Sequence, residues 1–174
     1  MIDNKEKYGI SVYCVLGLNC FFLFILQRTP GLSFKIGTAT PILLIPMIVA
    51  VACFLREWSG FLFGLVCGIA LDVFVGGSRC FHTVALLLIG ALAGLLYHYF
   101  FNRNIKSAII GGVCFSFAFC LARWIYLCLA QGDSSAFLML IRYEIPSALY
   151  TSLFIVPFFY YTRWLTRRHL IHNS

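Results

Sequence analysis

Long apolar runs separated by short polar breaks dominate this sequence. Each run is close to the length that an α-helix needs to cross the roughly 30 Å hydrocarbon core of a bilayer. The breaks contain residues that end helices, such as Pro30 with Gly31 and Gly76 with Gly77. The pattern predicts six membrane-spanning helices, at about residues 8–26, 40–55, 59–75, 81–101, 108–130 and 145–161.

Prolines and shorter segments add detail to this prediction. Residues 27–39 are expected to form an outer loop. Pro46 is expected to kink the second helix, and Pro157 the sixth. The apolar segment 136–141 is too short to span a bilayer, so we expect it to lie along the surface.

Composition supports a membrane protein. Of the 174 residues, 61% are hydrophobic and 11% are charged, and the mean hydropathy is +0.92, whereas soluble domains have about 25% charged residues. Six spans leave no room for a soluble domain, so residues 1–174 are predicted to form a single transmembrane domain. The net charge of +7 does not indicate nucleic acid binding, because the 13 lysines and arginines are scattered singly between the apolar runs.

The basic residues instead predict the orientation, since cytoplasmic loops carry an excess of lysine and arginine. With a cytoplasmic N-terminus, eight basic residues lie inside and four outside, and Arg123 remains within a span. Both chain ends are therefore predicted to be cytoplasmic. The inner residues are Lys5, Lys7, Arg56, Arg103, Lys106, Arg163, Arg167 and Arg168, and the outer ones are Arg28, Lys35, Arg79 and Arg142.

Glycines recur at four-residue spacing in the third and fourth predicted helices, so each set lies on one helical face. In membranes such small-residue faces let another helix approach closely. We interpret them as a docking surface for the membrane helix of a partner protein. Tight packing within this chain is the competing interpretation. The five glycines are Gly60, Gly64, Gly68, Gly90 and Gly94.

Asp72 lies one turn after Gly68 on the same face, and an ionisable residue within a span is a candidate functional site. Arg123 is the second charge inside a predicted span. The helical rise places the two residues within roughly 5 Å of the same depth. We predict that they pair, with snorkelling of Arg123 to the outer headgroups as the alternative.

Catalysis and metal binding are not predicted. The possible nucleophile and bases, Ser116, His82 and His98, stand in no catalytic motif, and the two histidines lie at opposite ends of one helix. Asp133 and Glu144 fall in the predicted outer loop, so they supply no second carboxylate at the depth of Asp72. The eight cysteines contain no C-x-x-C pair. No cofactor is expected.

The chain resembles the rod shape-determining MreD family. The likeness rests on six short spans, on the glycine and aspartate register from Gly64 to Asp72, and on the Gly77-Ser78 turn. Pro146 near the start of the last helix and the basic tail after it add to the resemblance. The family's usual glycine shortly after the Gly-Ser turn is missing here, where residues 79–82 read Arg-Cys-Phe-His.

The resemblance implies a non-enzymatic scaffold of the bacterial cell-elongation machinery in the inner membrane. It implies binding to the single-span protein MreC and support of RodA glycosyltransferase, a class B penicillin-binding transpeptidase and, indirectly, MreB filaments. It also implies a fold similar to the substrate-binding subunits of energy-coupling-factor transporters. Capture of a vitamin or metal in an outer cavity is therefore the alternative function, for which only Asp72, Arg123, Arg142 and Glu144 offer polar groups.

Overall fold

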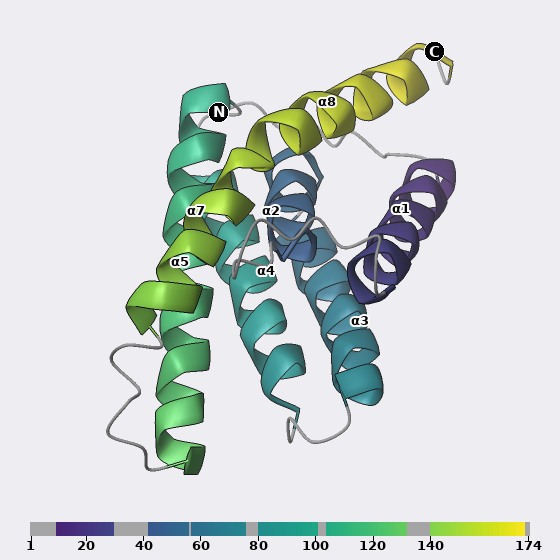
Figure 1. Cartoon of the computed structure of the whole chain (residues 1–174). Helices are drawn as coiled ribbons and strands as arrows, with labels where there is room; N and C mark the ends of the chain where they lie inside the picture. Colours follow the sequence, from purple (N-terminus) through teal and green to yellow (C-terminus); the bar gives the residue numbers. More distant parts are fainter. Residues whose placement is uncertain are drawn as a thin grey trace.

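The computed structural model describes residues 10–29, 42–55, 57–75, 80–100, 104–131 and 140–172, and within these ranges every regular element is a helix (Figure 1). The predicted all-α class is thus confirmed for the described residues. In chain order the elements are α1 (Ile10–Arg28), α2 (Leu44–Phe54), α3 (Glu57–Val75), α4 (Phe81–Tyr99), α5 (Ile105–Gln131), a π-helical turn (Leu140–Glu144), α7 (Ile145–Leu153) and α8 (Ile155–His172).

Two helical stretches are long and apolar enough to cross a membrane, Phe81–Tyr99 in α4 and Ile105–Tyr126 in α5. Their mean hydropathies are 1.7 and 1.9. Shorter apolar helices cover Ser11–Gln27, Leu44–Phe54 and Trp58–Phe74. Length and composition thus favour membrane association through two helices, and six crossings stay a prediction.

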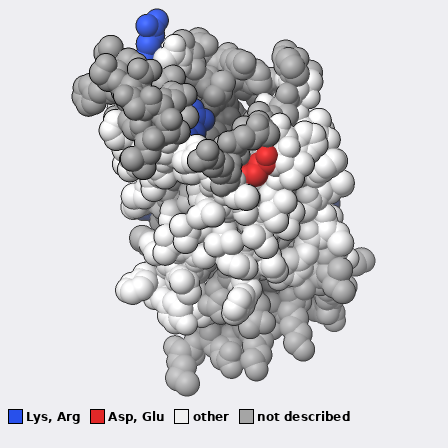
Figure 2. Space-filling view, turned by 90° about the horizontal axis from the view of Figure 1, so that it is seen from below, with Lys and Arg blue, Asp and Glu red and all other residues white. Residues whose placement is uncertain are grey.

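Large apolar side chains also cover the outward faces of four helices, and each of them is between 38% and 71% exposed. Seen from below (Figure 2), uncharged side chains make up most of the described surface at the end where α3 is followed by α4. The outward apolar residues are Leu18, Phe21, Phe22 and Ile25 on α1, Leu62, Val66, Ile69, Val73 and Phe74 on α3, Val84, Leu88, Leu92 and Leu95 on α4, and Ile109, Ile110, Leu121 and Ile125 on α5.

Helix α2 forms the centre of the bundle (Figure 1), and all of its residues are buried. A helix that is apolar on every side is expected to be covered on every side. The predicted kink at Pro46 is wrong, because the helix begins at Leu44 and the proline lies in its first turn. Amides of a first turn have no partner within the helix, so the missing N–H of Pro46 disturbs nothing.

Contacts between the helices fix their directions. The Ser59 hydroxyl near the start of α3 donates a 3.3 Å hydrogen bond to Tyr13, and Phe24 packs against Phe74 near the end of α3, so α1 and α3 run in parallel. Helix α4 returns antiparallel to α3 (Figure 1). In Figure 1 the first turns of α1 and the later turns of α8 lie at the same end of the bundle.

The sixth predicted helix is divided, and it is longer than expected. Helix α7 ends at Leu153 and α8 begins at Ile155, two residues before Pro157. Because Pro157 has no N–H, the carbonyl of Leu153 lacks its helical donor, and the Phe154 N–H turns to the Thr151 carbonyl at 3.2 Å. The interruption between α7 and α8 thus lies one turn before Pro157, the residue at which a kink was predicted.

Helix α8 continues to His172, so the sequence reading 145–161 was too short at its C-terminal end. It takes in the basic tail that the sequence analysis placed after the last span. The outer loop expected at 27–39, the turn at 76–79 and the surface segment at 136–141 fall largely outside the described residues.

Candidate functional site

The glycine faces of α3 and α4 lie against each other. A methyl group built on Gly64 would stand less than 3.0 Å from the Leu86 carbonyl, and one on Gly68 less than 3.0 Å from the Thr83 Cα. Gly60 and Gly90 face each other's carbonyl groups just as closely. The backbones of the two helices are thus in direct contact along a seam formed by Gly60, Gly64, Gly68 and Gly90.

This seam corrects the prediction that the five glycines bind a partner. Gly60, Gly64, Gly68 and Gly90 meet the neighbouring helix of the same chain, and Gly94 is also buried within the molecule. The physical reason is proximity, since only a short turn separates α3 from α4 and each helix is the other's nearest small-residue partner. The competing interpretation, packing inside the chain, holds.

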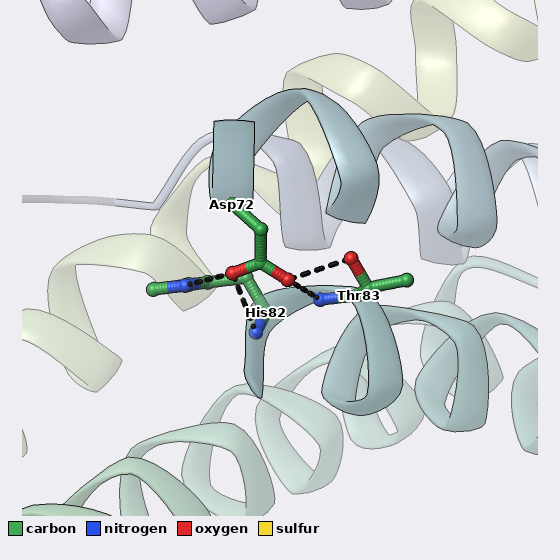
Figure 3. A network of polar contacts seen from close by, with 3 residues as sticks. All are labelled: Asp72, His82 and Thr83. Carbon is green, nitrogen blue, oxygen red and sulfur yellow. Dashed lines mark hydrogen bonds and ion pairs between the residues drawn. The ribbon is translucent and has the colours of Figure 1, made fainter. Parts of the chain in front are cut away.

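The seam ends at Asp72, whose carboxylate lies over the first turn of α4 (Figure 3). Oδ1 accepts hydrogen bonds from the His82 N–H at 3.1 Å and from the His82 imidazole Nδ1 at 2.9 Å. Oδ2 accepts from the Thr83 N–H at 2.7 Å and from the Thr83 hydroxyl at 2.6 Å. An ionised carboxylate only accepts, so Nδ1 of His82 carries the hydrogen.

Asp72 thereby caps a helix to which it does not belong. The residue at the N-cap position of α4 is Cys80, which has a left-handed backbone (φ 62°) and makes no side-chain cap. The first amides of a helix have no intrahelical partner, and its N-terminus carries a partial positive charge. The Asp72 carboxylate accepts hydrogen bonds from two of these amides, and its negative charge is favourable beside the partial positive charge of the helix N-terminus. The Asp72 side chain is only 10% exposed.

Sequence reasoning found Asp72 but missed His82 and Thr83 as its partners. The available signal was local: Cys80 is a poor cap for the predicted fourth helix, so its first amides needed an acceptor from elsewhere. From the sequence, His82 is considered as a catalytic base or metal ligand, not as a partner of Asp72.

Arg123 has a different partner from the one predicted. Its Nε and Nη2 atoms donate to Oε1 of Glu144 at 2.8 Å and 2.6 Å. The expected pair with Asp72 is therefore wrong. The π-helical turn that ends at Glu144 packs against α5 and brings this carboxylate, which the sequence analysis placed in a loop, to the Arg123 guanidinium.

The Glu144 side chain is 5% exposed and only one of its oxygens binds Arg123. The thiol of Cys120, one turn before Arg123 on α5, lies close to Glu144. The remaining Oε2 atom is buried without a hydrogen-bond partner. Such a buried unpaired oxygen is costly, and the buried Ser116 hydroxyl of α5 likewise has no hydrogen-bond partner among the described residues.

The two charged sites lie at the same end of the bundle. Phe81, at the start of α4, stacks on Tyr126 of α5 with 4.7 Å between ring centroids, and the His82 ring lies 6.3 Å from Phe119. The aromatic contacts thus place the capped turn of α4 beside the segment of α5 that contains Arg123. Arg123 nevertheless pairs with Glu144 and not with Asp72.

A groove of about 260 Å³ lies between α1 and α3 on the outside of the bundle. Gly17 opens it on the α1 side, since a methyl group built there meets no atom within 4 Å. The buried Cys20 and Cys67 side chains lie close together between its two walls. The lining residues are Gly17, Cys20, Phe21, Phe24, Leu62, Phe63, Val66, Cys67 and Ala70.

No protein-family model, curated protein or solved structure matches this chain. The similarity to the MreD family therefore stays a prediction from the sequence.

Proposed function

We propose that this chain is a multi-pass protein of the bacterial inner (cytoplasmic) membrane that crosses the bilayer six times and has both termini in the cytoplasm. The outward apolar side chains of α1, α3, α4 and α5 support this placement, because such large exposed apolar surfaces are unfavourable in water and normal in lipid. The predicted excess of basic residues on one side supports the orientation.

Within the membrane the proposed role is that of a non-enzymatic scaffold of the cell-elongation machinery. The protein binds the transmembrane helix of a single-span, MreC-like partner and supports peptidoglycan synthesis and cell shape. RodA glycosyltransferase, the class B transpeptidase and MreB filaments are the wider assembly that the family resemblance implies.

The observation that carries this proposal is the groove between α1 and α3. It replaces the glycine seam, which α4 occupies, as the docking surface. Its walls combine small residues such as Gly17, Cys20 and Ala70 with large apolar ones, the combination by which membrane helices pack closely. The open space at Gly17 gives a partner helix access to the α1 backbone.

Copurification from native membranes tests the proposal. Gly17→Leu fills the groove and is expected to leave the membrane level of the protein unchanged while the single-span partner is lost and rod-shaped cells become round. Ala118→Leu adds the same side chain to an exposed position on α5 and serves as the matched control, which should retain the partner. Undiminished copurification with Gly17→Leu would contradict docking in this groove.

One observation favours the alternative, a substrate-binding subunit of an energy-coupling-factor transporter. The buried Oε2 of Glu144 lacks a hydrogen-bond partner, as a ligand-binding oxygen would in the empty state. The same purification separates the two functions, since a transporter subunit is expected to bring down an ATPase module in place of an MreC-like protein.

A further inference from the structure

Helix α8 has a buried face and a basic aromatic face. Phe159, Thr162, Leu165 and Thr166 pack on the bundle and are at most 6% exposed. The opposite side of the helix carries aromatic rings and arginines, and the whole helix contains no acidic residue. We call this side the basic face of α8, formed by Tyr160, Arg163, Trp164, Arg167 and Arg168.

The aromatic members of this face are half exposed, with Tyr160 at 54% and Trp164 at 50%. Tyrosine and tryptophan with one wet side are typical of the boundary between lipid tails and headgroups. In Figure 1, α8 runs across one end of the bundle and extends beyond it toward the C-terminus. Its basic face therefore lies where a membrane surface would meet the molecule.

Arg168 is preorganised on this face. Its guanidinium carbon lies over the Trp164 ring, 4.3 Å from the ring centre, which is a cation–π contact. The N–H groups point outward in the guanidinium plane, and this edge matches two oxygens of a phosphate group. Stacking leaves these donors available while it limits the motion of the side chain.

The acidic side chains that the structure describes leave the positive charge of this face unneutralised. Among the described residues, no ion pair joins Arg163, Arg167 or Arg168 to an acidic side chain. Three arginines within six residues therefore favour an anionic partner.

We propose that the basic face of α8 binds the phosphate groups of anionic phospholipids at the cytoplasmic membrane surface. The inference rests on the proposed membrane placement and goes beyond the scaffold function. Lipid is the partner favoured over an acidic protein because the arginines alternate with half-exposed aromatic rings, which suit a headgroup layer. Arg168 on Trp164 holds one phosphate, and Arg163 and Arg167, one turn apart, attract the neighbouring headgroups.

Lipid retention by the purified full-length protein tests this site. Native mass spectrometry in detergent would compare bound phosphatidylglycerol with phosphatidylcholine. In detergent only residues that contact the bound headgroup contribute, each with roughly a fivefold effect on affinity, so R168Q should weaken phosphatidylglycerol binding about fivefold, and R163Q/R167Q/R168Q more. Phosphatidylcholine binding should change less than twofold in all variants.

Lys106 provides a matched control, because it is an exposed cation at the first turn of α5 and lies outside the basic face. K106Q is expected to change phosphatidylglycerol binding less than twofold. Equal losses in K106Q and R168Q, or no loss in the triple variant, would overturn the site.

The outcome also separates this inference from the proposed function. A membrane-embedded chain that shows no preference for phosphatidylglycerol would overturn the lipid site alone. Recovery of the chain outside the membrane fraction would overturn the membrane placement and the lipid site together.

Discussion

Buried charges show at the residue scale how the environment selects partners. Asp72 is held by four hydrogen bonds from the first turn of α4, and Arg123 is held by Glu144. Both arrangements answer the same need, because a charge removed from water requires donors or an opposite charge close by. Two of the four donors to Asp72 are backbone amides, which no side-chain pattern reveals.

A double-mutant cycle distinguishes the two possible partners of Arg123. Arg123→Gln and Glu144→Gln should each lower the free energy of unfolding in detergent, by about 2 to 3 kcal/mol, because each change leaves a poorly compensated charge. The double variant should lose less than the sum, with a coupling of about 1 kcal/mol or more.

Asp72→Asn combined with Arg123→Gln is the matched control cycle, and its effects should add because the residues have separate partners. Coupling between Asp72 and Arg123, with additivity between Arg123 and Glu144, would show that the assigned pairing is incorrect.

At the scale of elements, the α3–α4 hairpin is joined by backbone contact along the glycine seam and closed by the Asp72 cap. Glycine costs up to about 1 kcal/mol in a helix interior in soluble hosts, and close packing against the opposite backbone offsets that cost. The hairpin therefore has little tolerance for added side-chain volume. Helix α1 differs, since Gly17 faces open space.

Two alanine substitutions test whether the seam and the α1 surface differ in their tolerance for an added methyl group. Gly64→Ala should destabilise the protein by about 1 to 3 kcal/mol, because its methyl group overlaps the Leu86 carbonyl and forces the helices apart. Gly17→Ala should be neutral or stabilise by up to about 1 kcal/mol through helix propensity. Thermal unfolding of both variants in the same detergent provides the comparison. A Gly64→Ala variant as stable as the wild type would contradict direct backbone contact at the seam.

At the scale of the whole molecule, the direction of each helix places the start of α1 and the end of α8 on the same side. Helix α2 lies buried in the centre, and apolar side chains face outward from α1, α3, α4 and α5. This arrangement agrees with an even number of membrane crossings, which the proposed orientation requires.

Labelling of single cysteines tests the orientation. On a cysteine-free background, a membrane-impermeant thiol reagent should label a cysteine at position 135 in intact cells and a cysteine at position 174 only after the membrane is opened. The reason is that the first position lies on the predicted outer side and the second in the predicted cytoplasmic tail. Labelling at position 174 in intact cells would contradict the proposed topology.

The sequence alone determined features that depend on neighbouring residues along the chain. Apolar run length gave the helices, the Gly68 and Asp72 spacing placed a carboxylate on the small-residue face, and Pro157 marked a break in the last helix. The predicted ends of the helices were less accurate than their existence, because capping groups come from other parts of the molecule. Helix α8 ends at His172 and not near residue 161, and Pro46 lies in the first turn of α2, where it causes no kink.

Only the tertiary structure decided which groups meet. A small-residue face permits close approach but does not say which helix approaches, and here α4 of the same chain occupies the face of α3. The expected similar depth made Asp72 and Arg123 possible partners. In the folded chain, however, the Asp72 carboxylate binds the first turn of α4 and the Arg123 guanidinium binds Glu144. Periodicity specifies the face of a helix, whereas short-range contacts between charges and backbones depend on how the faces are assembled in three dimensions.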